Sequence, residues 1–287
     1  MLRALITVVL VLASGPASEQ AKLKPAAAKP ADRSVAPQYQ PSPIYDEQAE
    51  RQLLDLANQA RARAGASPLQ FDNGLILAAR AHAADMAEQQ QLSHQFSGEP
   101  SLPHRLAAAS ALHIDRAGEN VAVDLSIEHA HHELMLSPPH RENLLDPGYN
   151  VAGFGVIRSG ERLYVVEDFG HSLPEFSSQQ TEDAIAVALG RARRSAHLPG
   201  LARQADATLQ AAVCSMAQQD RLATQPMRDL AQRYSVLSFT SIHPDVLPTA
   251  ANRLLEDRNL SKVAVGVCFA RTNTYPSGVY WVGLLFY

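Results

Sequence analysis

The spacing of apolar residues predicts two helices at the start of the folded part of the chain. The first has apolar residues at helical spacing, at Leu53, Ala57, Ala60 and Ala64. Gly65 follows at the position where a helix commonly ends. The second helix begins after residues 72–73 and runs toward Leu92. Its inward face carries Leu75, Ala78, Ala79, His82 and Met86. We expect His82 on this face to be a hydrogen-bonded packing residue and not a ligand.

A third helix and a strand pair follow further along the chain. Residues 126–136 are expected to form a shorter helix with Ser126 as its N-cap and Ile127, Ala130 and Leu134 facing inward. Strand patterns come late, with a valine-rich segment at 151–157, a turn and a second strand at 162–169. Helices that precede a hairpin indicate an α+β layered domain and not a parallel βαβ fold.

The second half of the chain repeats features of the first half in the same order. The run Arg-Ala-Arg at residues 61–63 recurs at 191–193. The same offset matches residues 86–87 with 216–217 and Leu92 with Leu222. Both halves also end in a hairpin pattern, which in the second half covers 262–270 and 278–287. The repeat therefore predicts two tandem related domains, residues 44–175 and 180–287.

The N-terminal segment has the layout of a secretory signal peptide. Arg3 precedes an apolar stretch, and small residues follow it up to residue 18. Residues 19–43 are rich in alanine, proline and lysine, which predicts a disordered linker. A buried N-terminal helix is the alternative, but this linker would leave such a helix nothing to pack against. No cysteine precedes Cys214, so we expect a secreted product, periplasmic or extracellular, without a lipid anchor.

Composition and charge exclude several classes of protein. Of the 287 residues, 46% are hydrophobic and 19% charged, which is typical of globular domains. The net charge is -4, and since residues 1–43 carry +3, the remainder carries -7 and is a poor general binder of nucleic acid. Two cysteines cannot form a four-thiolate zinc site. The longest apolar run is too short for a transmembrane segment in the mature protein.

Three short segments of the first half concentrate candidate ligands, namely 92–96, 118–121 and 137–145. In the last segment we expect Ser137 to cap a new helix, with Pro138 at its first position. The backbone N–H of His140 would then bond to the Ser137 hydroxyl. The positive end of the helix dipole disfavours imidazolium, so His140 should be neutral and available as a metal ligand or hydrogen-bond acceptor.

Together these residues resemble a known family. The segment 134–145, Gly118-Glu119-Asn120, His94 and the segment 151–156 are similar in order and spacing to bacterial members of the CAP superfamily. This superfamily comprises cysteine-rich secretory proteins, antigen five and plant pathogenesis-related proteins, and the resemblance covers about residues 47–170. It implies an α-β-α sandwich with a central antiparallel sheet and an open cleft.

The resemblance also implies a set of site residues. In the family, two histidines and two acidic residues line the cleft and in some members hold zinc or another divalent cation. His94, Glu119 and His140 match three of these positions, and Ser137 stands where the second carboxylate is expected. Asn120, Ser137 and Arg141 would support the cleft. Loss of one anionic ligand should weaken the affinity for metal, and a purely structural polar network is the alternative interpretation.

Two further groups of residues invite interpretation as sites. His129 and Glu133 lie one helical turn apart, but a solvated helix face explains them better than a second metal site. In the second half, the repeat offset places Thr224 at the His94 position and Asn252 at the His140 position, and Gly-Glu-Asn does not recur there. The second domain is therefore expected to be a degenerate copy with a structural or partner-binding role.

The two cysteines both fall in the second half, Cys214 on a predicted helix and Cys268 on a predicted strand. In an exported protein they would form either a disulfide or two buried thiols. The final strand is apolar on both faces and must be covered on both sides.

Three functions remain open at this point. The first is a secreted binding module that holds a small ligand, a lipid or a cell-envelope component in the cleft. The second is a metal-assisted hydrolase that uses the same residues. Against an enzyme stand the missing G-x-S-x-G motif and the lack of a cysteine in the first half. The third is a structural protein of the envelope.

Overall fold

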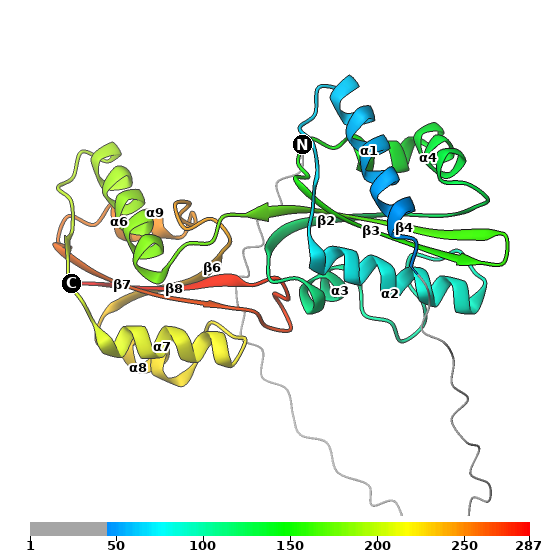
Figure 1. The fold of residues 1–287 in the computed structure, drawn as a ribbon. Coiled ribbons are helices and arrows are strands. Elements are labelled where there is room, and N and C mark those ends of the chain that lie inside the picture. Colours follow the sequence, from blue (N-terminus) through cyan, green and yellow to red (C-terminus); the bar gives the residue numbers. More distant parts are fainter. Residues whose placement is uncertain (1–44) are drawn as a thin grey trace, which may run out of the picture. The chain divides into compact units, whose positions relative to one another are not determined.

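A computed structural model describes residues 45–287. The predicted signal peptide (1–18) and all of the predicted linker (19–43) lie outside these residues. The described part holds two four-stranded sheets, each with helices on both faces (Figure 1). No helix within it is both long and apolar enough to cross a membrane.

The first sheet has the strand order β1-β3-β4-β2. Its strands are β1 (Gln70–Phe71), β2 (His113–Asp124), β3 (Val151–Ser159) and β4 (Arg162–Leu173). β1 is parallel to β3, and the other pairs are antiparallel. This mixed α and β architecture confirms the predicted α+β class and the α-β-α layering, with one short parallel strand added to the antiparallel sheet.

Helices cover both faces of this sheet. One face packs against α1 (Glu47–Arg63), α4 (Ile127–Leu136) and α5 (Pro138–Leu145). The other face packs against α2 (Asn73–Gln89) and α3 (Leu102–Ala109). Figure 1 shows α1 and α4 on the side of the sheet opposite α2 and α3.

Local chemistry explains where the predicted helices begin and end. The Asp72 side chain accepts a hydrogen bond from the backbone N–H of Leu75, and the Ser126 side chain accepts one from that of His129. Gly65 has φ of 75° just after α1, a conformation that suits glycine. α2 ends at Gln89, so Leu92 is not part of the helix and its side chain is exposed, contrary to the expectation.

One strand of the first sheet differs from the sequence-based expectations. β2 is a long strand that the hydrophobic pattern did not reveal, because residues 113–124 lack a regular apolar alternation. It nevertheless pairs with β4 along its length, with one irregularity between Ile114 and Arg116. β2 carries Gly118-Glu119-Asn120, so the strand missed in the sequence is the one that holds a candidate site residue.

The second sheet has the order β5-β7-β8-β6 and the same strand directions as the first. Its strands are β5 (Ala202–Arg203), β6 (Ser235–Ser241), β7 (Lys262–Ala270) and β8 (Val279–Phe286). One face packs against α6 (Ser178–Ser195) and α9 (Ala251–Leu255), the other against α7 (Ala207–Gln218) and α8 (Gln225–Ala231). Every residue of β8 is buried, as its two-sided apolar pattern requires.

The capping residues of α2 and α7 give a different register between the two halves from the one predicted from the sequence. Asp72 begins α2 and Asp206 begins α7, and each accepts a hydrogen bond from the backbone N–H three residues later. This correspondence places Met216 of α7 at the position of His82. The constant offset matched Met216 with Met86 instead, so the offset found in the sequence does not describe the structural correspondence.

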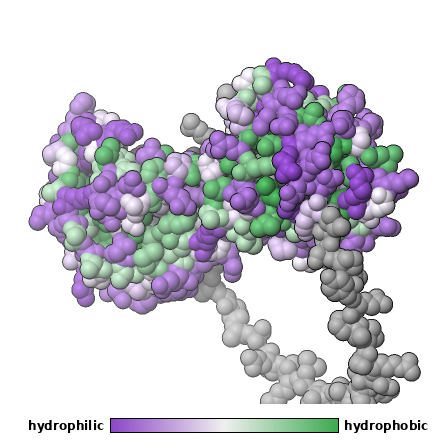
Figure 2. Space-filling model, in the orientation of Figure 1, coloured by the Kyte–Doolittle hydropathy of each residue, from purple (hydrophilic) through white to green (hydrophobic). Residues whose placement is uncertain are grey.

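The structure also pairs the two cysteines. Cys214 of α7 is bonded to Cys268 of β7, so the disulfide ties a helix to the sheet beneath it. Polar and charged residues make up much of the visible surface, with apolar areas between them (Figure 2). The exposed large apolar side chains include Leu92, which lies two residues before His94, and Leu136, which precedes Ser137.

Candidate functional site

Glu119 lies on the edge strand β2 and is almost fully buried, with 7% of its surface exposed. Its Oε1 lies 2.9 Å from Nδ1 of His94, and its Oε2 accepts a hydrogen bond from the Arg105 guanidinium. His94 belongs to the loop between α2 and α3, and 59% of its side chain is exposed. Because a carboxylate oxygen accepts this bond, Nδ1 carries the hydrogen, and in the neutral ring Nε2 is the nitrogen with the free lone pair.

Arg105 of α3 is the cation of the site, although the sequence analysis did not single it out. It bonds to Glu119, lies 3.1 Å from Glu99 Oε1 and donates to the His94 carbonyl at 3.2 Å. One guanidinium thus bridges two carboxylates and holds the loop that bears His94. An isolated arginine in a short helix gives no pattern in the sequence that could have revealed it.

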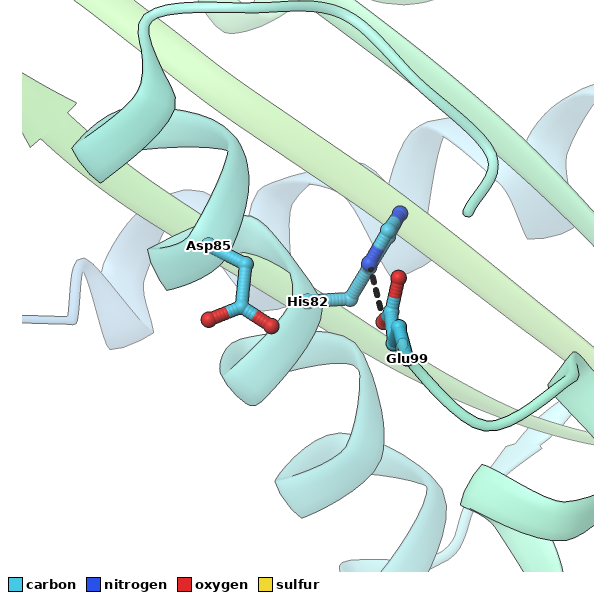
Figure 3. A group of neighbouring side chains, drawn as sticks. All are labelled: His82, Asp85 and Glu99. Carbon is cyan, nitrogen blue, oxygen red and sulfur yellow. Dashed lines mark hydrogen bonds and ion pairs between the residues drawn. The ribbon is translucent and has the colours of Figure 1, made fainter. Parts of the chain in front are cut away.

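His82 is fully buried next to this site, and both of its ring nitrogens are hydrogen-bonded. Its Nδ1 is 2.7 Å from Glu99 Oε1, and its Nε2 donates to the Ser93 carbonyl at 2.9 Å. Figure 3 draws the His82–Glu99 interaction, with Asp85 on the same helix as His82. Donor atoms of His82, Asp85 and Glu99 lie within 4.8 Å of one another, but both ring nitrogens of His82 are already bonded. The predicted packing role of His82 is confirmed.

His140 approaches from α5, on the other side of the edge strand. Pro138 occupies the first turn of this helix as expected, but the Ser137 side chain makes no capping hydrogen bond. Ser137 also ends α4, and its backbone N–H bonds to the Glu133 carbonyl. The expected bond from His140 to the Ser137 hydroxyl is therefore wrong.

Side-chain amides hold α5 against β2. Asn120 Nδ2 donates to the His140 carbonyl at 3.0 Å and to Glu167 Oε2 at 3.1 Å. Asn143 Nδ2 donates to Asn120 Oδ1 at 3.1 Å and to the Glu119 carbonyl at 3.2 Å. Asn120 was predicted from the sequence to support the cleft, whereas Asn143 and Glu167 were not predicted. Two adjacent acids in the otherwise apolar strand β4 were the signal that could have found Glu167.

The charges around the site follow from burial. Burial lowers the pKa of His140, and the nearby His94 ring lowers it further, which favours the neutral form of His140. Asp168 lies directly opposite Glu119 in the β2–β4 ladder and is fully buried. Its burial raises its pKa well above the usual range, and the charge of Glu119 adds to this effect.

The structure brings His94 and Glu119 into direct contact, but it does not bring the donors of His94, Glu119 and His140 together as three ligands. Within residues 45–287, the only group of three whose donor atoms approach within 4.8 Å is His82, Asp85 and Glu99. Glu119 therefore orients His94 and is bonded to Arg105. Arg141 is exposed, and its side chain donates only to the Met135 carbonyl, at 3.4 Å.

Residues 54–169 match the model of the cysteine-rich secretory protein family, CAP. This segment is a CAP domain. It runs from α1 to β4, so the CAP domain includes His94, Glu119 and His140, and the second sheet lies outside it.

Relatives of the CAP domain are found in bacteria. The chain is 32% identical over 112 residues to the uncharacterized protein YkwD of Bacillus subtilis, covering 39% of this chain and 43% of YkwD. It is 35% identical over 124 residues to the uncharacterized membrane protein YlbC of the same organism, covering 42% and 34%. The match thus spans less than half the length of either curated relative.

Solved structures give a similar result. An extracellular protein with an SCP domain from Bacillus anthracis is 25% identical, with a TM-score of 0.40, covering 44% of this chain and 41% of that one. An outer surface protein from Borrelia burgdorferi is 16% identical, with a TM-score of 0.42, covering 46% and 99%.

Proposed function

We propose that this protein is an exported binding module that holds a divalent cation between His94 and His140 and, through it, a small ligand of the cell envelope. The observation that carries this proposal is the state of His94. Its ring is exposed, while its Nδ1 is held by a carboxylate that is itself buried and bonded to Arg105. A surface histidine with no role would not require such a support.

The donor set suits a cation such as zinc. Metal-binding histidines commonly donate their second ring nitrogen to a carboxylate, which is the relation of His94 to Glu119. His94 Nε2 and the neutral ring of His140 would be the two protein ligands. A bound cation would supply Lewis acidity toward an oxygen of the ligand. Glu119 accepts from Nδ1 of His94, which leaves Nε2 as the ring nitrogen that would face the cation. Asn120 holds the His140 backbone in place.

Two observations support export. Residues 1–18 carry the signal-peptide pattern. The Cys214–Cys268 disulfide is the kind of bond that persists in oxidising compartments outside the cytoplasm. A lipid or another envelope component that bears an acidic or carbonyl oxygen would then be the ligand.

The test is calorimetric titration of the purified full chain with Co²⁺ and Zn²⁺. We expect one cation per chain, with binding abolished in His94→Ala and His140→Ala and weakened roughly 10- to 100-fold in Glu119→Gln. His243→Ala, an exposed histidine of the second half, is the matched control and should bind as wild type does. No binding by the folded wild type, or equal loss in the control, would show that the proposal is wrong.

A further inference from the structure

The two sheets can be matched strand by strand through their hydrogen-bonded ladders. In the parallel pair of each sheet, Val151 lies opposite Gln70 and Lys262 lies opposite Ala202. One residue further, Ala152 lies opposite Phe169 of β4, and Val263 lies opposite Phe286 of β8. Phe169 and Phe286 are thus at equivalent positions, which sets the correspondence for the remaining residues of both ladders.

Under this correspondence, four buried polar residues on β2 and β4 of the first sheet match apolar residues in the second sheet. Two of the four positions are on β2 and two on β4. Residues that are paired across the β2–β4 ladder match residues that are paired across the β6–β8 ladder. The matched pairs are Glu119 with Val236, Asn120 with Leu237, Glu167 with Leu284, and Asp168 with Leu285. The same fold is therefore built with apolar residues at all four positions, so these polar residues are not required for it.

Glu167 and Asp168 are the two of the four with carboxyl oxygens that have no hydrogen-bond partner within the described chain, and only Glu167 has a bond that reaches α5 through Asn120. Glu167 is fully buried, its Oε1 has no hydrogen-bond partner within the described chain, and its Oε2 accepts only from Asn120. A buried carboxyl with one partner is unfavourable compared with a leucine at the same position.

The one hydrogen bond of the Glu167 carboxyl within the described chain connects it to Asn120, which in turn bonds to the helix that carries His140. The side-chain nitrogen of Asn120 donates to both Glu167 and the His140 carbonyl. The side-chain oxygen of Asn120 accepts from Asn143, which lies on α5 as His140 does. The Glu167 carboxyl thereby holds the amide of Asn120 in the orientation that bonds α5 at two points. In the second sheet the corresponding pair, Leu237 and Leu284, offers no such bond.

We infer that Glu167 is a positioning residue of the site, which orients Asn120 so that Asn120 fixes the turn of α5 bearing His140. This inference rests on the proposed function of His94 and His140. It adds a buried residue on a different strand that touches neither histidine.

The test replaces the pair by the residues of the second sheet, in the full-length double variant Asn120→Leu/Glu167→Leu. We expect it to fold with a urea midpoint close to that of wild type, because replacement of the buried carboxyl offsets the loss of the bonds from Asn120 to the His140 carbonyl and Asn143. We also expect the ¹⁵N and ¹H signals of the His140 ring to shift and Co²⁺ affinity to fall roughly 10- to 100-fold. Glu167→Gln keeps an acceptor for Asn120 and should restore both site readouts.

Val165→Ala is the matched control, since Val165 is a fully buried apolar neighbour on β4. It should lower the urea midpoint and leave the His140 signals and Co²⁺ affinity unchanged. A double variant that fails to fold would overturn the inference, because the pair would then be needed for the fold. Unchanged His140 signals in a folded double variant would overturn it as well. If wild type binds no Co²⁺, the proposed function fails, while the His140 signals still decide the positioning role.

Discussion

Arg61 and Arg193 make equivalent sets of four hydrogen bonds in the two halves of the described chain. Both side chains are fully buried, and each donates only to backbone carbonyls. Arg61 donates to Ser67, Leu144, Asp146 and Tyr149, and Arg193 donates to Pro199, Leu255, Asp257 and Leu260. Each arginine thus anchors a long helix to the segment before the central hairpin. This match is independent of the strand ladders and supports the same correspondence between the halves.

Replacing either arginine should destabilise its own half. Arg61→Met removes four hydrogen bonds to backbone carbonyls, of which those to Leu144 and Tyr149 are buried, and we expect a loss of about 3 kcal/mol in the free energy of unfolding. Arg193→Met should have a similar effect on the second half. Trp281, the single tryptophan, is buried in that half, so urea unfolding followed by its fluorescence should shift for Arg193→Met.

The exposed Arg63 on the same helix as Arg61 is the matched control, and Arg63→Met should unfold as wild type does by circular dichroism. A loss below about 1 kcal/mol in Arg61→Met would contradict the anchoring role, because even one unsatisfied buried carbonyl costs about that much.

The buried Glu167 predicts a specific dependence of stability on pH. Burial raises its pKa from 4.5 to about 7, against the opposing effect of the hydrogen bond from Asn120. Between these values the folded state keeps the proton while the unfolded state releases it. Stability therefore falls as pH rises through this window, by about 3 kcal/mol in total. Glu167→Gln cannot ionise and should lack this component.

The measurement is the free energy of unfolding of wild type and Glu167→Gln between pH 4.5 and 8. The stability of the variant relative to wild type should rise with pH across the window and level off above it. Burial raises the pKa of Asp168 as well, but that contribution is common to both proteins and cancels in the difference. The exposed Glu142→Gln should give a flat difference, and a flat difference for Glu167→Gln would refute the prediction.

Reduction of the disulfide should weaken the second half. Cys214 and Cys268 are 54 residues apart, and closing a loop of that length restricts the unfolded chain by about 4 kcal/mol. We expect a reductant to lower the urea midpoint reported by Trp281 fluorescence. Cys214→Ala/Cys268→Ala should show the low midpoint with or without reductant. Equal midpoints for reduced and oxidised wild type would exclude a stabilising role for the bond.

Local patterns in the sequence were sufficient for much of the fold. The spacing of Leu53, Ala57 and Ala60 predicted α1, and Asp72 and Ser126 marked the starts of α2 and α4, because helix periodicity and capping depend on neighbours within a few residues. The two hairpins were also found from valine-rich runs and turns. β2 was missed because the burial of its polar residues depends on β4 and the helices, and not on an alternation of its own.

What the sequence by itself determined is the class of the fold, its helices and hairpins, and the family motifs that contain His94, Glu119 and His140. Only the tertiary structure decided how these residues are supported. Arg105 reaches Glu119 because α3 packs beside β2, and Glu167 reaches Asn120 because β4 pairs with β2 in one register. The physical reason is that a ladder between distant strands brings together side chains whose separation along the chain carries no signal, and a change of one residue in that register would place them on opposite faces.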